Sequence, residues 1–159
     1  MNKRKSWDEY FIDLLEPLSE RATCDRGKTA VIIVINNEIV STGYVGSPSE
    51  LPHCDDVGHL MHRVINELDE ESQHCVRTNH GEMNAIAQAA KNGKATKGGT
   101  LYCKMTPCYT CAKMLIQIGI KRIVAKKRYH ADQLSMDLFK QAGIEVNILK
   151  DEVVKYEKQ

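Results

Sequence analysis

The feature that most constrains the fold is the run TAVIIVI at residues 29–35, in which almost every residue is β-branched. A continuous run of this kind is typical of a strand that is buried on both faces of its sheet. Asn36 and Asn37 supply a turn directly after it, and residues 38–44 return as a second strand. The sequence therefore predicts a hairpin whose first strand lies inside a covered sheet.

Helices and strands alternate through the rest of the chain. Ser6 caps a helix over residues 6–22, with Glu9 at the spacing of a capping box. The pattern then predicts a short helix within 57–68, helices over 80–92, 108–118 and 131–142, strands over 100–105, 122–126 and 144–149, and a charged tail after 150. Alternation in the second half implies parallel crossovers. We therefore expect a three-layer α/β/α fold with a five-stranded mixed sheet, in a single domain spanning residues 1–159.

The composition excludes several classes of protein. The formal net charge is +1 over 159 residues, which argues against a protein that coats DNA or RNA through a concentrated basic face. The longest apolar run, residues 30–35, is too short to cross a membrane, and the N-terminal segment lacks the apolar region of a secretory signal. We expect a cytoplasmic location, where the six cysteines stay reduced and their clustering indicates metal binding or catalysis rather than disulfides.

Two short motifs point to the chemistry. The first is HGE at residues 80–82, and the second is PCYTC at residues 107–111. Together they match the H-x-E…P-C-x-x-C pattern of zinc deaminases, and each leads into a predicted helix. A lone C-x-x-C would fit a structural zinc half-site or a redox pair equally well, so the prediction depends on both motifs in this order.

The spacing of the candidate ligands suits a catalytic zinc ion. Cys108 and Cys111 share one face of a helical first turn, where the helix N-terminus favours the thiolate form. His80, from another helix, is the third predicted ligand, which leaves the fourth position for water. Glu82 is the predicted catalytic residue, which would take a proton from that water and deliver it to the ring nitrogen of the substrate. Because side chains two apart on a regular helix diverge, His80 and Glu82 can both face the metal only at an irregular helix start.

The sequence resembles the deoxycytidylate (dCMP) deaminase family of the cytidine deaminase superfamily over most of residues 19–145. The matching stretches are 19–26, 41–44, 46–54, 77–86, 101–102, 107–111 and 119–123. The resemblance implies a cytidine deaminase-like fold, hydrolysis of dCMP to dUMP and ammonia, and a homo-oligomer, often a hexamer. It also implies activation by dCTP and inhibition by dTTP.

Two positions depart from the family pattern. The family usually has HAE where this chain has Gly81, and glycine loosens a helix start by about 1 kcal/mol relative to alanine. The family usually has GYNG where this chain has Val45. The asparagine contacts nucleotide in relatives, whereas valine offers no hydrogen bond. The second departure therefore bears on sugar recognition and on control by triphosphates.

The resemblance also suggests a second, structural zinc ion. Some family members bind one with residues from the region that precedes the helix at 80–92. We expect Cys24, His53 and His74 to be its ligands, with a fourth ligand unspecified. Cys54 and Cys75 belong to the same region. The alternative is that these residues are unpaired buried thiols and surface histidines.

A phosphate group on the substrate requires cationic or amide donors. Arg26 and Arg77 lie in family-like stretches near the proposed site and are the predicted phosphate contacts. The alternative is that both are exposed surface arginines.

Three functions remain open at this point. The first is deamination of free dCMP, which has no polymeric nucleic acid or membrane as partner. The second is deamination of another substrate of the superfamily, such as cytosine, cytidine, guanine, a riboflavin precursor or an adenosine in tRNA, of which the near-neutral charge disfavours the last. The third is a zinc-stabilised module that senses nucleotides without catalysis. Retention of Glu82 argues against it.

Overall fold

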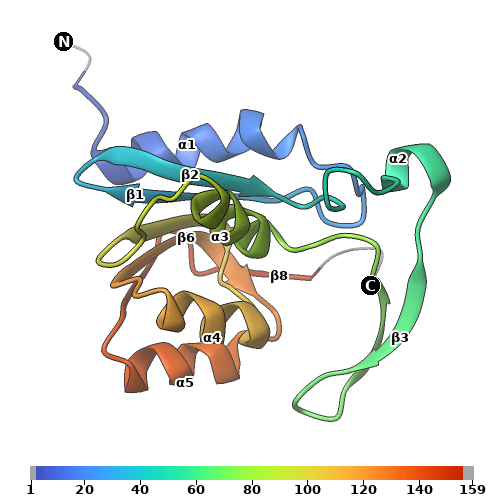
Figure 1. Ribbon diagram of the computed structural model, residues 1–159. Coiled ribbons are helices and arrows are strands. Elements are labelled where there is room, and N and C mark those ends of the chain that lie inside the picture. Colours follow the sequence, from blue (N-terminus) through green and yellow to red (C-terminus); the bar gives the residue numbers. More distant parts are fainter. Residues whose placement is uncertain (1–2, 156–159) are drawn as a thin grey trace.

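The computed structural model describes residues 3–155 and has a central sheet between two layers of helices (Figure 1). The main path of the sheet runs β2-β1-β5-β6-β7. In that order, these strands are Glu38–Tyr44, Ala30–Ile35, Thr100–Met105, Arg122–Tyr129 and Glu145–Ile148. β1 pairs antiparallel with both β2 and β5, whereas β5, β6 and β7 are parallel. The predicted three-layer α/β/α fold with a mixed sheet is therefore confirmed, but within residues 3–155 the sheet has six strands rather than the predicted five, because a short strand at residues 153–154 also pairs with β6.

The two faces of the sheet hold two separate cores. Helix α1 (Trp7–Ser19) covers one face, and helices α3 (Gly81–Lys91), α4 (Tyr109–Gln117) and α5 (Gln133–Gln141) cover the other. Within β1, Val31 and Ile33 pack into the core beneath α3, α4 and α5, while Ile32 and Val34 pack into the core beneath α1. Both faces of β1 are buried, which explains why its sequence is continuously apolar.

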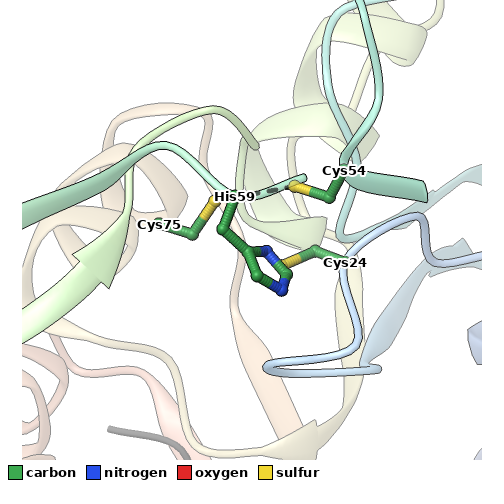
Figure 2. A group of neighbouring side chains, drawn as sticks. All are labelled: Cys24, Cys54, His59 and Cys75. Carbon is green, nitrogen blue, oxygen red and sulfur yellow. Dashed lines mark hydrogen bonds between the residues drawn. The ribbon is translucent and has the colours of Figure 1, made fainter. Parts of the chain in front are cut away.

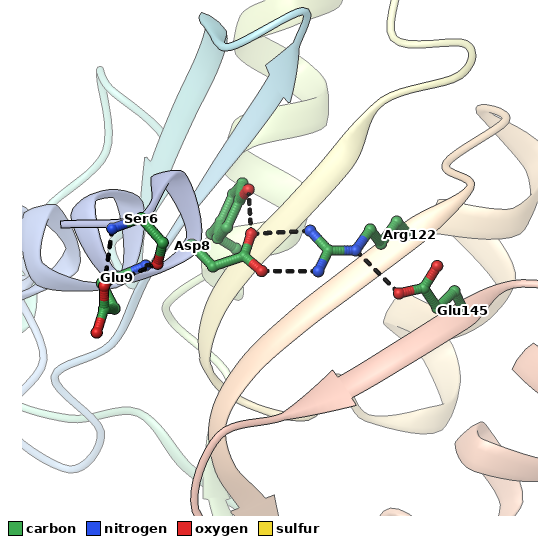
Figure 3. A network of polar contacts seen from close by, with 6 residues as sticks. Ser6, Asp8, Glu9, Arg122 and Glu145 are labelled. Carbon is green, nitrogen blue, oxygen red and sulfur yellow. Dashed lines mark hydrogen bonds and ion pairs between the residues drawn. The ribbon is translucent and has the colours of Figure 1, made fainter. Parts of the chain in front are cut away.

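Helix α1 is anchored to the sheet by a network of polar contacts (Figure 3). The Asp8 carboxylate accepts two hydrogen bonds from the Arg122 guanidinium, at 2.8 and 2.7 Å, and one from the Tyr102 hydroxyl at 2.8 Å. The hydrogen bond from Arg122 lowers the pKa of Asp8. On its other side, Arg122 donates to Glu145 at 3.1 Å. The network therefore links α1 to three strands of the sheet.

The segment that follows β2 differs most from the prediction. Instead of a short helix within 57–68, the chain forms one helical turn, α2 (Cys54–Val57), and then a separate hairpin of β3 (Met61–Ile65) and β4 (Glu71–Cys75). In Figure 1 this hairpin projects from the body of the molecule, away from the central sheet. The predicted helix is therefore wrong.

The turn of the hairpin explains this error. The Asn66 side-chain oxygen accepts hydrogen bonds from the backbone amides of Leu68 and Glu70, at 2.9 and 3.0 Å. Asp69 adopts a φ of 59°, which asparagine and aspartate tolerate better than most residues. Asparagine side chains that bond to nearby amides compete with helix formation, and here they reverse the chain.

The remaining boundaries need small changes. The capping box of Ser6 and Glu9 is present at the start of α1. The predicted tail after residue 150 contains a short strand, β8 (Val153–Val154), which pairs parallel with β6. Within residues 3–155, no helix has both the length and the apolar content to span a membrane.

Candidate functional site

Two helix starts meet at the predicted metal ligands, which we call the catalytic trio: His80, Cys108 and Cys111. His80 is the N-cap of α3, Cys108 is the N-cap of α4, and Cys111 lies in the first turn of α4. The Nδ1 atom of His80 lies 3.5 Å from the sulfur of Cys108 and 3.5 Å from the sulfur of Cys111. The structure thus brings together all three residues that the motifs singled out.

These distances suit a tetrahedral zinc ion. A sulfur about 2.3 Å and a nitrogen about 2.0 Å from the same tetrahedral zinc lie about 3.5 Å apart. All the potential ligand atoms of the catalytic trio lie within 4.8 Å of one another. Cys111 is buried, whereas His80 retains solvent exposure. The residues present therefore fit a zinc ion held by three protein ligands, with one side of the site open.

Glu82 stands beside the catalytic trio. Its side chain is buried, at 8% relative exposure, and it lines the same pocket as His80 and Cys108. His80 has extended backbone angles, φ −65° and ψ 154°, because it precedes the helix rather than belonging to it. The irregular helix start that the sequence required is therefore present, and it lets His80 and Glu82 face one pocket although they are two residues apart.

The charges of the site are coupled. Burial raises the pKa of Glu82. The hydrogen bond with Cys111, together with His80, lowers the pKa of Cys108 to about 4. In turn, the hydrogen bond between His80 and Cys108 raises the pKa of His80 to about 9. The hydrogen bond between Cys111 and Cys108 raises the pKa of Cys111. The two helix N-termini favour the anionic sulfur at this position, as a cation site requires.

Two glycines bring α3 close to the sheet. A Cβ atom added at Gly43 of β2 would lie 2.0 Å from the carbonyl oxygen of Gly81 and 2.4 Å from the amide nitrogen of Ala85. A Cβ atom added at Gly81 would lie 3.3 Å from the carbonyl oxygen of Gly43. Glycine is therefore required at residue 43, whereas alanine fits at residue 81 with a small adjustment.

The pocket at the catalytic trio includes two further predicted positions. Arg26 lines it, and the Nη2 atom of Arg26 donates to the backbone carbonyl of Gln73 at 3.2 Å. Val45 lines it as well, and its side chain has no group that could form a hydrogen bond. Arg77 is not among the lining residues, and its Nε atom donates to the carbonyl of Gly58 at 3.1 Å. The structure thus places Arg26, but not Arg77, in the lining of this pocket.

A second group of ligand-type side chains lies near the base of the hairpin (Figure 2). We call it the Cys24 cluster, and it consists of Cys24, Cys54, His59 and Cys75, whose potential ligand atoms all lie within 4.8 Å of one another. The sulfurs of Cys54 and Cys75 are 3.6 Å apart, and the Cys24 sulfur is 3.6 Å from Nδ1 of His59. Two thiolates on one tetrahedral zinc lie about 3.8 Å apart, so this group also fits a zinc ion.

Of the predicted ligands for a second zinc, only Cys24 belongs to this cluster. His53 lies outside it, because its ring Nδ1 is 2.9 Å from the hydroxyl of Thr23. His74 also lies outside it and lines the pocket of the catalytic trio. Neighbouring residues of a strand point to opposite faces, so β4 can direct only one of His74 and Cys75 to the cluster.

Sequence reasoning missed Cys54, His59 and Cys75 as partners of Cys24. Strand alternation in β4 was the available signal, because it separates His74 from Cys75. His59 had no local signal, since it reaches Cys24 only through the fold. Its role is supported by Asp25, whose carboxylate oxygen lies 3.0 Å from Nε2 of His59. Metal-binding histidines usually donate their other ring nitrogen to a carboxylate in this way.

Comparisons with known proteins agree with this geometry. Residues 5–127 match the family model of the cytidine and deoxycytidylate deaminase zinc-binding region. ComE operon protein 2 of Bacillus subtilis (strain 168) is 37% identical over 153 residues, which cover 96% of this chain and 76% of the relative. The deoxycytidylate deaminase of Saccharomyces cerevisiae is 33% identical over 143 residues, and these cover 90% of this chain but only 45% of the yeast protein.

A solved structure is also similar. The dCMP deaminase of cyanophage S-TIM5, crystallised in complex with dCMP and dUMP, superposes with a TM-score of 0.72 at 26% sequence identity, covering 92% of this chain and 99% of the phage chain. The family model spans most of the chain, and it includes both the catalytic trio and Glu82. This chain is therefore a member of the cytidine and deoxycytidylate deaminase family.

Proposed function

We propose that the protein catalyses the hydrolytic deamination of dCMP to dUMP with release of ammonia. The observation that carries this proposal is the catalytic trio, in which one imidazole nitrogen stands 3.5 Å from each of two sulfurs, beside the buried Glu82. The choice of dCMP is supported by the yeast relative named deoxycytidylate deaminase and by the phage enzyme that was crystallised with dCMP and dUMP.

His80, Cys108 and Cys111 would hold the zinc ion. When bound there, zinc would activate water for attack at C4 of the cytosine ring. Glu82 would accept a proton at its carboxylate and deliver it to ring nitrogen N3, and would then assist the departure of ammonia. Burial raises the pKa of Glu82, which brings this carboxyl group closer to the range in which it can both accept and return a proton near neutral pH.

Arg26 would bind the phosphate of the substrate. It lines the pocket of the catalytic trio and is partly buried, and a guanidinium can donate two parallel hydrogen bonds to a phosphate. Val45 would present an apolar surface to the nucleotide in place of the asparagine of relatives. Arg77 forms no part of the proposed site, since its Nε atom contacts Gly58 instead.

A second zinc ion would be bound by the Cys24 cluster. Four protein ligands fill a tetrahedral shell and leave no position for water, which is the pattern of a structural rather than a catalytic site. The Asp25 carboxylate would fix the His59 ring with Nδ1 toward the metal. The chain would therefore carry two zinc ions with different tasks.

The family resemblance extends the proposal to assembly and control. We propose a cytoplasmic homo-oligomer, with a hexamer as the expected form, whose activity responds to dCTP and dTTP. The projecting hairpin supports an assembly, because several large apolar side chains in and beside it are exposed: Leu60, Met61, Ile65, Leu68 and Val76. Exposed apolar patches on such an element are typical of contact surfaces.

A steady-state assay tests the central proposal. Ammonia release should be measured with dCMP, deoxycytidine, cytosine and guanine, with and without dCTP or dTTP. We expect dCMP to give the highest kcat/KM. Deamination of guanine or cytosine in the absence of any turnover of dCMP would overturn the proposal.

A further inference from the structure

The loop at residues 24–26 joins the Cys24 cluster to the pocket of the catalytic trio. On the basis of the proposed function, we infer that a metal ion in the Cys24 cluster positions Arg26 and thereby sets the affinity of the pocket for the phosphate of the nucleotide. Cys24, Asp25 and His59 then act as positioning residues. The chemistry of deamination stays with Glu82 and the catalytic trio.

Three consecutive residues of this loop contact the hairpin region. The Cys24 sulfur lies 3.6 Å from Nδ1 of His59, and the Asp25 carboxylate lies 3.0 Å from Nε2 of the same ring. The Arg26 guanidinium donates to the carbonyl of Gln73 at 3.2 Å. One histidine therefore holds two residues of the loop, and the third reaches across to β4.

Strand β4 carries both sites on neighbouring residues. Cys75 belongs to the Cys24 cluster and also borders the pocket of the catalytic trio, which Gln73 and His74 line together with Arg26. A displacement of Cys75 would therefore move the carbonyl that holds the Arg26 side chain. The Cys75 side chain and the Gln73 carbonyl belong to residues only two apart on β4, so the position of this strand couples the cluster to the pocket.

The loop and the hairpin are separate segments that a metal ion in the Cys24 cluster would link. At its two ends the loop is tied to Val45, through hydrogen bonds from Thr23 N to Val45 O at 3.0 Å and from Val45 N to Thr29 O at 3.1 Å. The hairpin forms its own two-stranded sheet, separate from the central one. A metal ion bound to Cys24, Cys54, His59 and Cys75 would cross-link the loop, α2 and the base of the hairpin. It would thereby restrict the motion of these segments relative to one another.

The expected effect is selective for the phosphate. Arg26 would donate charge-assisted hydrogen bonds only to a ligand that carries a phosphate, and such bonds depend strongly on geometry. Loss of the metal would release the loop and weaken these bonds. Binding of deoxycytidine, which has the same base and sugar but no phosphate, would not depend on Arg26.

The test uses His59→Ala, which removes one ligand and the contact with Asp25. His62→Ala is the matched control, because His62 lies on the same hairpin, is exposed and belongs to neither metal group. His59→Cys should restore a ligand atom. Each change is made alone in the full chain to measure turnover. It is also combined with Glu82→Gln, which prevents turnover, to measure equilibrium binding of dCMP and deoxycytidine. Zinc per chain is measured by atomic emission.

We expect the His59→Ala variant to hold one zinc ion fewer than the unchanged chain and to bind dCMP roughly tenfold more weakly, while its affinity for deoxycytidine changes less than about twofold. The His62→Ala variant should match the unchanged chain, and His59→Cys should restore the zinc content and most, but not all, of the affinity for dCMP, because it supplies a ligand atom without the contact to Asp25. An unchanged affinity for dCMP after loss of the zinc, an equal loss for both ligands, or a single zinc ion in the unchanged chain would each overturn the inference.

Two further measurements keep the outcome unambiguous. If the His59→Ala variant does not fold, Asp25→Asn tests the same contact at an exposed residue, and the same selective loss for dCMP, with smaller size, is expected. Turnover of dCMP by the unchanged chain tests the proposed function separately. Normal turnover of dCMP combined with insensitivity to His59→Ala would reject only the positioning role of the cluster.

Discussion

The catalytic trio and the Cys24 cluster use the same kinds of ligand but differ in number and in setting. Both place a sulfur and an imidazole nitrogen at distances of 3.5 to 3.6 Å, as one zinc ion requires. The trio has three ligands and an open side next to Glu82, whereas the cluster has four. Ligand number alone therefore separates a site that can admit water from one that cannot.

The settings differ just as much. The trio lies at the starts of α3 and α4, whose buried side chains belong to the main core. The cluster lies on a loop, on the single turn α2 and at the base of a hairpin outside the central sheet. We expect the core to hold the trio in place without a metal, whereas the proposed metal of the cluster would hold the surrounding segments together. The comparison teaches that one ligand chemistry can serve catalysis or folding according to the elements that present it.

The largest expected effect is a loss of kcat when Glu82, the residue beside the trio, is replaced. Replacing Glu82 with glutamine should lower kcat for dCMP by about 10³-fold, because the amide cannot carry the proton. Zinc content should stay unchanged, since Glu82 is not a ligand. The exposed residue Glu38 provides a control, and Glu38→Gln should leave kcat unaltered. Loss of zinc from the Glu82→Gln variant would show that Glu82 is itself a ligand. The trio and the Cys24 cluster would then no longer differ in their number of ligands.

The next effect concerns stability rather than rate. Cys54→Ser should lower the free energy of unfolding by about 4 kcal/mol, because it removes a ligand of the proposed structural metal. The corresponding fall in Tm is about 10 °C for a chain of this size. Thermal unfolding with and without a strong chelator checks this, because the chelator should bring the unchanged chain down to the level of the variant. A difference in Tm that persists in the chelator would assign the effect to packing of the Cys54 side chain instead.

A third prediction tests whether the trio depends on close packing of its helices. Gly43→Ala should destabilise the protein by about 3 kcal/mol, because its Cβ atom would collide with the backbone of α3. It should also lower kcat, since α3 carries His80 and Glu82. Gly81→Ala is the matched control at the facing position, and its effect should stay within about 1 kcal/mol. Equal losses of stability from the two changes would contradict the close approach of β2 and α3.

The sequence predicted the trio well because its signals are local. The HGE and PCYTC motifs each place their side chains at the start of one helix, and the positions of those helices follow from the alternation of strands and helices. Ile32 and Ile33 show the same principle, since their strand is predicted by its own composition even though they face different cores. Here, short-range spacing determines both the element and the direction of its side chains.

The Cys24 cluster could not be predicted to the same extent because its members meet through an irregular segment. Val57, Leu60, Val64 and Leu68 recur at helical spacing, yet the turn at Asn66 makes this segment a hairpin. The hairpin decides that Cys75 rather than His74 reaches Cys24. The choice of His53 and His74 followed from their place in a region where some family members bind a second zinc, and not from an element that directs their side chains toward Cys24. Long-range pairing of this kind depends on turn chemistry that periodicity does not register.

The smallest effect comes from a region that holds no metal ligand and so provides a reference for both sites. Hydrogen bonding by Arg122 lowers the pKa of Asp8 below its usual value of 3.8. A carboxyl group of this kind stabilises the fold fully above its unfolded pKa, and this contribution is lost as the pH falls through the lower folded pKa. Asp8→Asn should therefore cost about 1 kcal/mol of unfolding free energy at pH 6, because the ion pair is only partly buried.

The pH dependence makes this prediction specific. The difference between the unchanged chain and the Asp8→Asn variant should shrink from pH 6 to pH 3, as measured by denaturant unfolding at both values. Acid also releases zinc from thiolate ligands, but that loss affects both proteins equally and cancels in the difference. In an Arg122→Gln background the difference should be small at both values. A difference that is the same at pH 6 and pH 3 would mean that Asp8 anchors α1 by packing and geometry rather than by its charge.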